Sequence, residues 1–148
     1  MAASNDNTVT LISDGAAAIP QYSMVSTDNA GNIGLAADAI TRTVGIAQEG
    51  IPAAVVPGTP IPGQPTAVQV LGVSYAIAGP GGFAPGFGAT LALMADPAGS
   101  GRLIAHNAGG APTNLHCANW TPTATQAVAG AAAGSLIRVL IVPCPVTA

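Results

Sequence analysis

The sequence predicts an all-β domain built from two similar halves. Short apolar runs alternate with turns rich in Gly, Pro, Asn and Asp, which is typical of β-strands joined by tight connections. The clearest strand is Thr66–Ile77, TAVQVLGVSYAI, and Leu136–Val142, LIRVLIV, has a similar pattern. Each follows a Gly-containing approach and carries one hydrophilic residue, Gln69 or Arg138, directly before Val-Leu. At 148 residues the chain has the size of one ordinary domain.

Three landmarks recur in the same order and indicate an internal duplication. The matched pairs are Pro20–Ser23 with Pro85–Gly88, Asp28–Gly31 with Asp96–Gly99, and Val70–Leu71 with Val139–Leu140. The two halves are expected at about residues 16–78 and 83–142, with Gly79–Gly88, GPGGFAPGFG, as the linker between them. The repeated unit is a strand, a D-x-A-G turn, a strand, a loop and a further strand.

Alternation and turn signals place the individual strands. The expected strands are Thr8–Ile12, Tyr22–Ser26, Ile33–Ala37, Thr41–Ala47, Thr66–Ile77, Thr90–Met94, Arg102–Ala105, Leu115–Trp120 and Leu136–Val142. The apolar parity of Thr66–Ile77 switches at Gly72, between Val68 and Val70 on one side and Val73, Tyr75 and Ile77 on the other, so a β-bulge there would bring both sets onto one buried face. Two glycines in Ala127–Gly134 disfavour a helix in that segment.

The ends and the proline-rich segment complete the domain plan. Residues 1–12 are expected to form an N-terminal arm and a first, edge strand, and residues 13–148 a single β domain. Gln48–Pro65 holds five prolines. Because proline removes hydrogen-bond donors from a sheet, this insert is predicted to lie outside the sheets.

Composition excludes several partners. Only 6% of the residues are charged, and the three cationic side chains are all arginines, so nucleic-acid binding is not expected. So few charges favour permanent association with neighbours over a polar monomer surface. The most apolar window, Ala124–Val142, is interrupted by Gln126 and Arg138, so no membrane span is expected. Met1–Thr10 lacks a basic and an apolar region, which predicts no secretory signal and a chain that stays in the cytoplasm where it is made.

The sequence offers little material for catalysis or metal binding. The acidic residues are scattered among turns, and the aspartates of the two D-x-A-G segments are predicted to accept local backbone N–H groups. His106, His116 and Cys117 do not have the spacing of a zinc site, and no nucleophile motif is present. We expect no enzyme activity, no metal and no cofactor. Cys117 and Cys144 are expected to be reduced, buried thiols, although a disulfide between them stays open.

Two segments resemble a known protein family. Thr41–Glu49, TRTVGIAQE, followed by a Gly-Pro approach and by Ala67–Gly72, AVQVLG, resembles the V-G-I-A-x-E and G-x-x-V-x-V-x-x-G pattern of tailed-bacteriophage head decoration proteins, also called capsid cement proteins. Ala127–Val142, AVAGAAAGSLIRVLIV, is similar to the closing strand of that family.

The resemblance implies a small β-barrel or β-tulip subunit without catalytic residues. It further implies a homotrimer that is made in the host cytoplasm and sits on the outside of an expanded virion capsid, over junctions between major capsid protein subunits. In such proteins an N-terminal arm often completes a sheet with the capsid. The matching candidates for capsid binding in this chain are Thr8, Val9, Thr10, Leu11 and Ile12.

Apolar residues in the protruding segments are the candidates for contacts with other copies or with the capsid. They are Ile51, Val55, Val56, Ile61, Phe83, Phe87 and Trp120. For Trp120, the only tryptophan, a place in the core is favoured over a role as an interface anchor. The alternative function is a host-surface or carbohydrate-binding β-domain of a phage tail or fibre, for which the chain has few aromatic residues.

Overall fold

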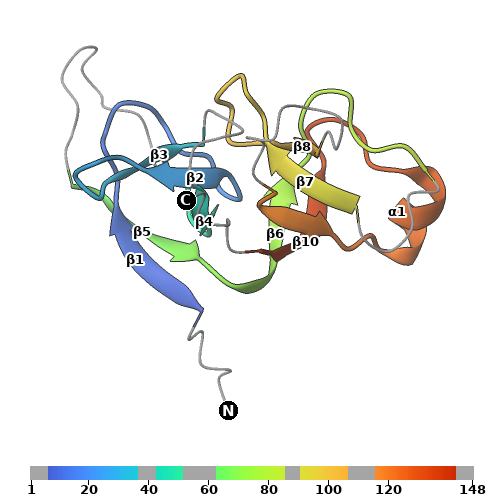
Figure 1. Cartoon of the computed structure of the whole chain (residues 1–148), viewed down its shortest axis with the longest axis horizontal. Helices are drawn as coiled ribbons and strands as arrows, with labels where there is room; N and C mark the ends of the chain where they lie inside the picture. The colour runs from blue at the N-terminus through green and yellow to red at the C-terminus, as the bar shows by residue number, and fades with distance from the viewer. Residues whose placement is uncertain (1–6, 37–42, 52–62, 86–90, 107–115, 143–148) are drawn as a thin grey trace.

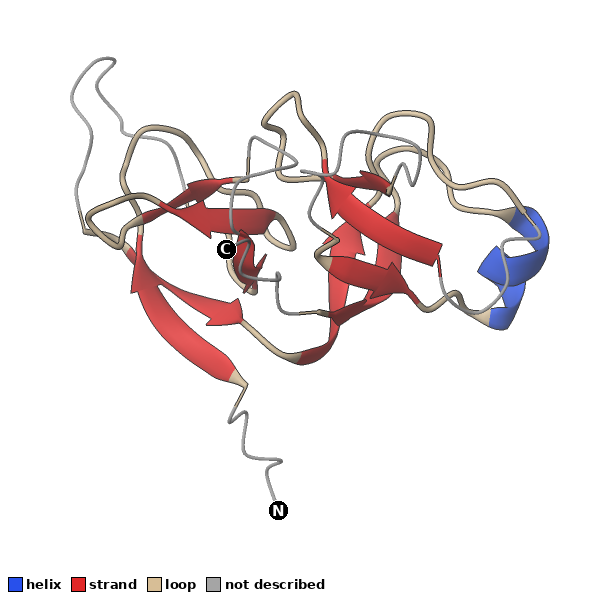
Figure 2. Cartoon of the chain, in the orientation of Figure 1, coloured by secondary structure: helices blue, strands red, loops and turns tan. Residues whose placement is uncertain are grey.

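The protein is nearly all β, with two curled antiparallel sheets side by side (Figure 1). The computed structural model describes residues 7–36, 43–51, 63–85, 91–106 and 116–142. Strands dominate the described residues, and one short helix lies at the end of the second half (Figure 2). The elements are β1 (Thr8–Ile12), β2 (Met24–Thr27), β3 (Ile33–Leu35), β4 (Thr43–Ala47), β5 (Pro65–Gln69), β6 (Gly72–Ile77), β7 (Leu91–Ala95), β8 (Leu103–Ala105), β9 (Ala118–Trp120), α1 (Ala124–Ala129) and β10 (Leu136–Ile141).

The two sheets repeat one topology. The first has the strand order β1-β5-β4-β2-β3, and the second has β6-β10-β9-β7-β8, so each strand of the first half has its counterpart five strands later. Smaller features repeat as well. The parallel bridge between Ser13 and Ile33 recurs between Ala78 and Leu103, and the antiparallel bridge between Ile19 and Ile51 recurs between Phe83 and Ala131. The predicted architecture of two similar β halves is therefore confirmed.

Matching hydrogen bonds fix which residues correspond. The Ser13 amide donates to the Gln64 carbonyl as the Ala78 amide donates to the Ser135 carbonyl. Residue 13 thus corresponds to 78 and residue 64 to 135, and the strand registers then equate Thr8–Ile12 with residues 73–77 and Pro65–Gln69 with residues 136–140. The predicted match of Val70–Leu71 with Val139–Leu140 is consequently displaced by two residues.

The boundary between the halves differs from the predicted one. The chain passes from the first sheet to the second at the short link between β5 and β6, where Gly72 has φ +86°. Gly79–Gly88 is not a linker, because its described residues carry the Phe83 bridge and correspond to the segment after β1. A Gly/Pro-rich composition is typical of linkers, but here it serves tight turns inside the second half.

The long strand predicted at Thr66–Ile77 is two strands in different sheets. Positive φ at Gly72 turns the chain instead of forming a bulge within one strand. The predicted burial of Val73 and Tyr75 is wrong, because Ser74 and Ala76 point inward instead. The strand predicted at Leu136–Val142, by contrast, is one continuous strand, β10.

Two apolar clusters fill the halves, and the larger one crosses between them. Ile19, Val25, Ile33, Ala47, Ile51 and Val68 form the smaller cluster inside the first half. The larger cluster centres on Trp120, whose ring stacks on Phe83 with the ring centroids 5.2 Å apart. Met24, from the first half, belongs to this larger cluster, and its amide donates to the Gly101 carbonyl at 2.7 Å. Packing at Met24 and Gly101 therefore holds the two halves together.

Turn and helix ends follow local side-chain chemistry. Asp28 Oδ1 accepts the Ala30 amide at 2.8 Å, and Asp96 Oδ1 accepts the Ala98 amide at 3.1 Å, so the predicted role of these carboxylates is confirmed. The prediction of no helix before β10 is wrong. Thr123 and Gln126 form a capping box that starts α1. Gly130 is the C-cap residue, so this glycine ends the helix and does not prevent it.

The proline-rich insert is only partly described. Ile51 bridges to Ile19 and Pro65 begins β5, which places the two ends of the insert at the first sheet. Residues 52–62 lie outside the described residues, so the prediction that they leave the sheet stays a prediction.

Candidate interaction surface

The first candidate surface is the open edge of β1. This strand is the edge of the first sheet and pairs only on its β5 side among the described residues. The Val70 amide donates to the Asn7 carbonyl and the Ser13 amide to the Gln64 carbonyl, so the odd-numbered residues of β1 are the ones bonded to β5. By the alternation of an antiparallel ladder, the backbone N–H and C=O groups of Thr8, Thr10 and Ile12 point away from the sheet. They are positioned to receive another strand.

The corresponding edge in the second half is partly occupied. β6 is the edge strand there, and its outward Val73 carbonyl accepts a hydrogen bond of 2.7 Å from Gln69 Nε2 of the first half. The Tyr75 carbonyl accepts one of 3.1 Å from the Ser74 hydroxyl, which itself accepts from Gln48 Nε2 at 3.0 Å. Among the described residues the two edges therefore differ, since two outward carbonyls of β6 have partners within the chain and the outward carbonyls of β1 have none.

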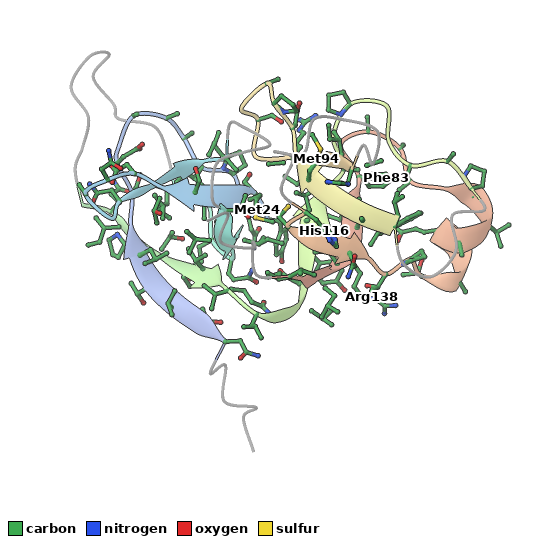
Figure 3. The ribbon with its side chains drawn as sticks, in the orientation of Figure 1. Met24, Phe83, Met94, His116 and Arg138 are labelled. Carbon is green, nitrogen blue, oxygen red and sulfur yellow. The ribbon has the colours of Figure 1, made fainter. Side chains whose placement is uncertain are left out.

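The second candidate surface is the outer face of β6 and β10, called here the β6/β10 face. Alternation directs six side chains outward, which pair across the two strands as Val73 with Leu140, Tyr75 with Arg138 and Ile77 with Leu136. Val73 is 55% exposed, Tyr75 53% and Leu136 49%. Figure 3 shows Arg138 at the outer side of the second half, away from the core residue Phe83.

Sequence reasoning missed the β6/β10 face because it equated apolar residues with buried ones. The signal that could have found it is the run LIRVLI, which is apolar on both faces of β10. Such a run is typical of a strand covered on both sides. In this chain Ile137, Val139 and Ile141 are buried in the core, while Leu136 is 49% exposed and Leu140 39%.

The sequence-predicted site residues lie in several different places. Thr8–Ile12 form the edge strand, with Val9 39% and Ile12 43% exposed. Ile51, Phe83 and Trp120 are buried in the chain's own cores, so their side chains contribute no surface to an interface. The remaining candidates, Val55, Val56, Ile61 and Phe87, lie outside the described residues.

Titratable groups do not converge in the described parts of the chain. The rings of His106 and His116 are 6.0 Å apart, and His116 Nε2 lies 2.7 Å from the Ala118 carbonyl oxygen. Across the residues described, no group of three or more His, Cys, Asp or Glu side chains is close enough to hold a metal ion. Cys117 is buried and Cys144 lies outside the described ranges, so their pairing is untested. Within the same ranges no helix has the length and apolar character to cross a membrane.

Comparison with known proteins adds no family assignment. Neither the protein-family models nor the curated protein sequences that were searched match this chain. The features of the chain that bear on a function are therefore the two surfaces described above and the motif resemblance in the sequence.

Proposed function

We propose that this chain is a structural decoration, or cement, protein of a tailed-bacteriophage head. In this proposal it assembles as a homotrimer, binds the outside of the expanded capsid over junctions between major capsid protein subunits, and stabilises the shell. It performs no catalysis. Its place is the outer surface of the virion, after synthesis in the host cytoplasm.

The observation that carries the proposal is the open edge of β1. Thr8, Thr10 and Ile12 direct backbone donors and acceptors outward, and a strand of a capsid subunit could extend the sheet there. Such binding uses main-chain hydrogen bonds and needs few charged side chains. This agrees with a chain in which only 6% of residues are charged. Many weak contacts of this kind become strong when a trimer engages a periodic lattice.

Sedimentation with heads tests the proposal directly. Purified chain is mixed with expanded heads that lack it and, separately, with unexpanded procapsids, and both are pelleted through a cushion. We expect saturable binding to the expanded heads and little binding to the procapsids. Equal binding to both particles, or binding to neither, would contradict the proposal.

A proline substitution tests the edge itself. Thr10→Pro removes an outward N–H and places a ring on the open edge, while the β1–β5 ladder keeps its hydrogen bonds. We expect head binding to weaken by at least about tenfold, with the fold retained. Thr10→Ala is the matched control, since it changes the side chain and keeps the N–H, and it should bind almost as well as the wild type.

A further inference from the structure

The internal duplication supplies a control for the β6/β10 face. The equivalent outer face of the first half, on β1 and β5, pairs Thr8 with Gln69, Thr10 with Ala67 and Ile12 with Pro65. Thr8 corresponds to Val73, Thr10 to Tyr75 and Gln69 to Leu140, because the two registers superpose. At three of these positions, Thr8, Thr10 and Gln69, one backbone arrangement therefore accepts polar residues where the second half exposes large apolar ones, whereas isoleucine stands at position 12 and at its counterpart 77.

The apolar character of the β6/β10 face is thus not a requirement of the fold. Val73 is 55% exposed and does little for the core. Tyr75 is 53% exposed and keeps one edge-to-face contact with the ring of Tyr22, at 5.8 Å between the ring centroids, so Val73 and Leu140 are the clearer cases. Leu71, in the link before β6, is a further large apolar side chain and is 48% exposed. A contiguous exposed apolar patch of this kind marks an interaction site.

Arg138 indicates what kind of surface covers this face. Its guanidinium is held at one end, where Nε donates to the Thr121 carbonyl at 3.2 Å and lies 3.4 Å from Thr121 Oγ1. Arg138 makes no ion pair with any carboxylate in the described residues. The outward positions of β6 and β10 include no acidic residue either. A partner that covers the face must therefore compensate a desolvated cation, for which a carboxylate is the suitable group.

Two copies of this chain meeting face to face on β6 and β10 do not satisfy that requirement. A two-fold contact would bring two Arg138 guanidinium groups into one apolar interface, and the six outward positions would supply no counter-charge. The face therefore calls for a different surface, apolar and with an acidic residue. We assign it to the capsid protein, and sedimentation velocity of the free protein distinguishes this from a different surface of a neighbouring copy.

We propose that the β6/β10 face binds an apolar patch of the capsid protein that presents a carboxylate to Arg138. This inference rests on the proposed function and deepens it, because it adds a side-chain contact to the strand addition at β1. The face is close to β1 along the chain, since only the short link at residues 70–71 separates β6 from β5, the neighbour of β1.

The closing experiment measures head binding with substitutions copied from the first half. Val73→Thr combined with Leu140→Gln installs the residues that the same backbone already carries at Thr8 and Gln69. We expect at least about tenfold weaker binding to expanded heads, with unchanged thermal unfolding. Arg138→Glu is a second, independent variant and should weaken binding to a similar degree. Val128→Thr, on α1 at an 80% exposed position outside the face, is the control and should bind like the wild type.

The outcomes separate the two proposals. If the wild type does not bind expanded heads, the decoration function fails and this inference fails with it. If the wild type binds and both face variants bind equally well, only this inference is overturned. Sedimentation velocity of the free wild type and of the free face variants tests whether the β6/β10 face joins copies of the chain to one another. A face variant that dissociates the oligomer would show that the face joins copies of the chain, which also overturns the inference.

Discussion

Replacing Gly101 with alanine should loosen the contact between the two halves. Gly101 has φ +69°, a conformation that costs an L-residue about 1–2 kcal/mol. A Cβ atom there would lie 2.7 Å from Leu35 Cδ2 and 2.9 Å from Ser23 Cβ, both in the first half. Overpacking of this kind costs a further amount of about 1–3 kcal/mol. Gly101→Ala should therefore lower the free energy of unfolding by about 2–5 kcal/mol.

Gly31→Ala is the matched control for this prediction. Gly31 has φ +85°, but a Cβ atom there meets nothing within 4 Å, so only the backbone cost of about 1–2 kcal/mol applies. Urea unfolding followed by the fluorescence of the buried Trp120 measures both variants. The difference between them isolates the packing of the halves. If Gly101→Ala costs no more than Gly31→Ala, the interface between the halves does not have the geometry described.

Three further substitutions test the core, a turn and the helix. Trp120→Ala should lower the free energy of unfolding by about 3–5 kcal/mol, because it leaves a cavity at the centre of the larger cluster beside Phe83. Thermal unfolding followed by circular dichroism measures this, and a loss below about 1 kcal/mol would contradict the placement of Trp120 in the core. Asp96→Ala should lower the free energy of unfolding in urea by about 1–2 kcal/mol, since the carboxylate accepts hydrogen bonds from the Ser100 hydroxyl at 2.8 Å and from the Ala98 amide. An unchanged urea midpoint would argue against these two hydrogen bonds. Thr123→Ala should remove the capping box but change the global free energy of unfolding by less than about 1 kcal/mol, because α1 buries no residue. Amide hydrogen exchange should then be faster in α1 alone, and faster exchange throughout the domain would refute this prediction.

The fold class and most strands were predictable because they depend on local signals. The D-x-A-G turns are a clear case, since the side chains of Asp28 and Asp96 bond to amides two residues away. The duplication was detectable for the same reason, through repeated turns. Strand ends shifted by one to three residues, as at β9, where pairing with β7 and β10 decides the length.

The division of Thr66–Ile77 between two sheets was not predictable from apolar pattern. The inward positions of β6 are Ser74, whose hydroxyl accepts a hydrogen bond from Gln48, and Ala76, which belongs to the larger cluster with Phe83 and Trp120. The larger residues Val73 and Tyr75 lie on the outer face, opposite to the usual preference. Apolar pattern alone cannot distinguish a core-facing from an outward apolar residue, because both faces of β10 carry leucine or isoleucine.

The placement of the chain on a head tests the central claim most directly. Cryo-electron microscopy of expanded heads saturated with the protein should show its density over the junctions between capsid subunits. The account predicts that β1 extends a capsid strand through Thr8, Thr10 and Ile12, and that Arg138 lies against a capsid carboxylate. Heads without added density, or density in which β1 and the β6/β10 face both point to solvent, would contradict it.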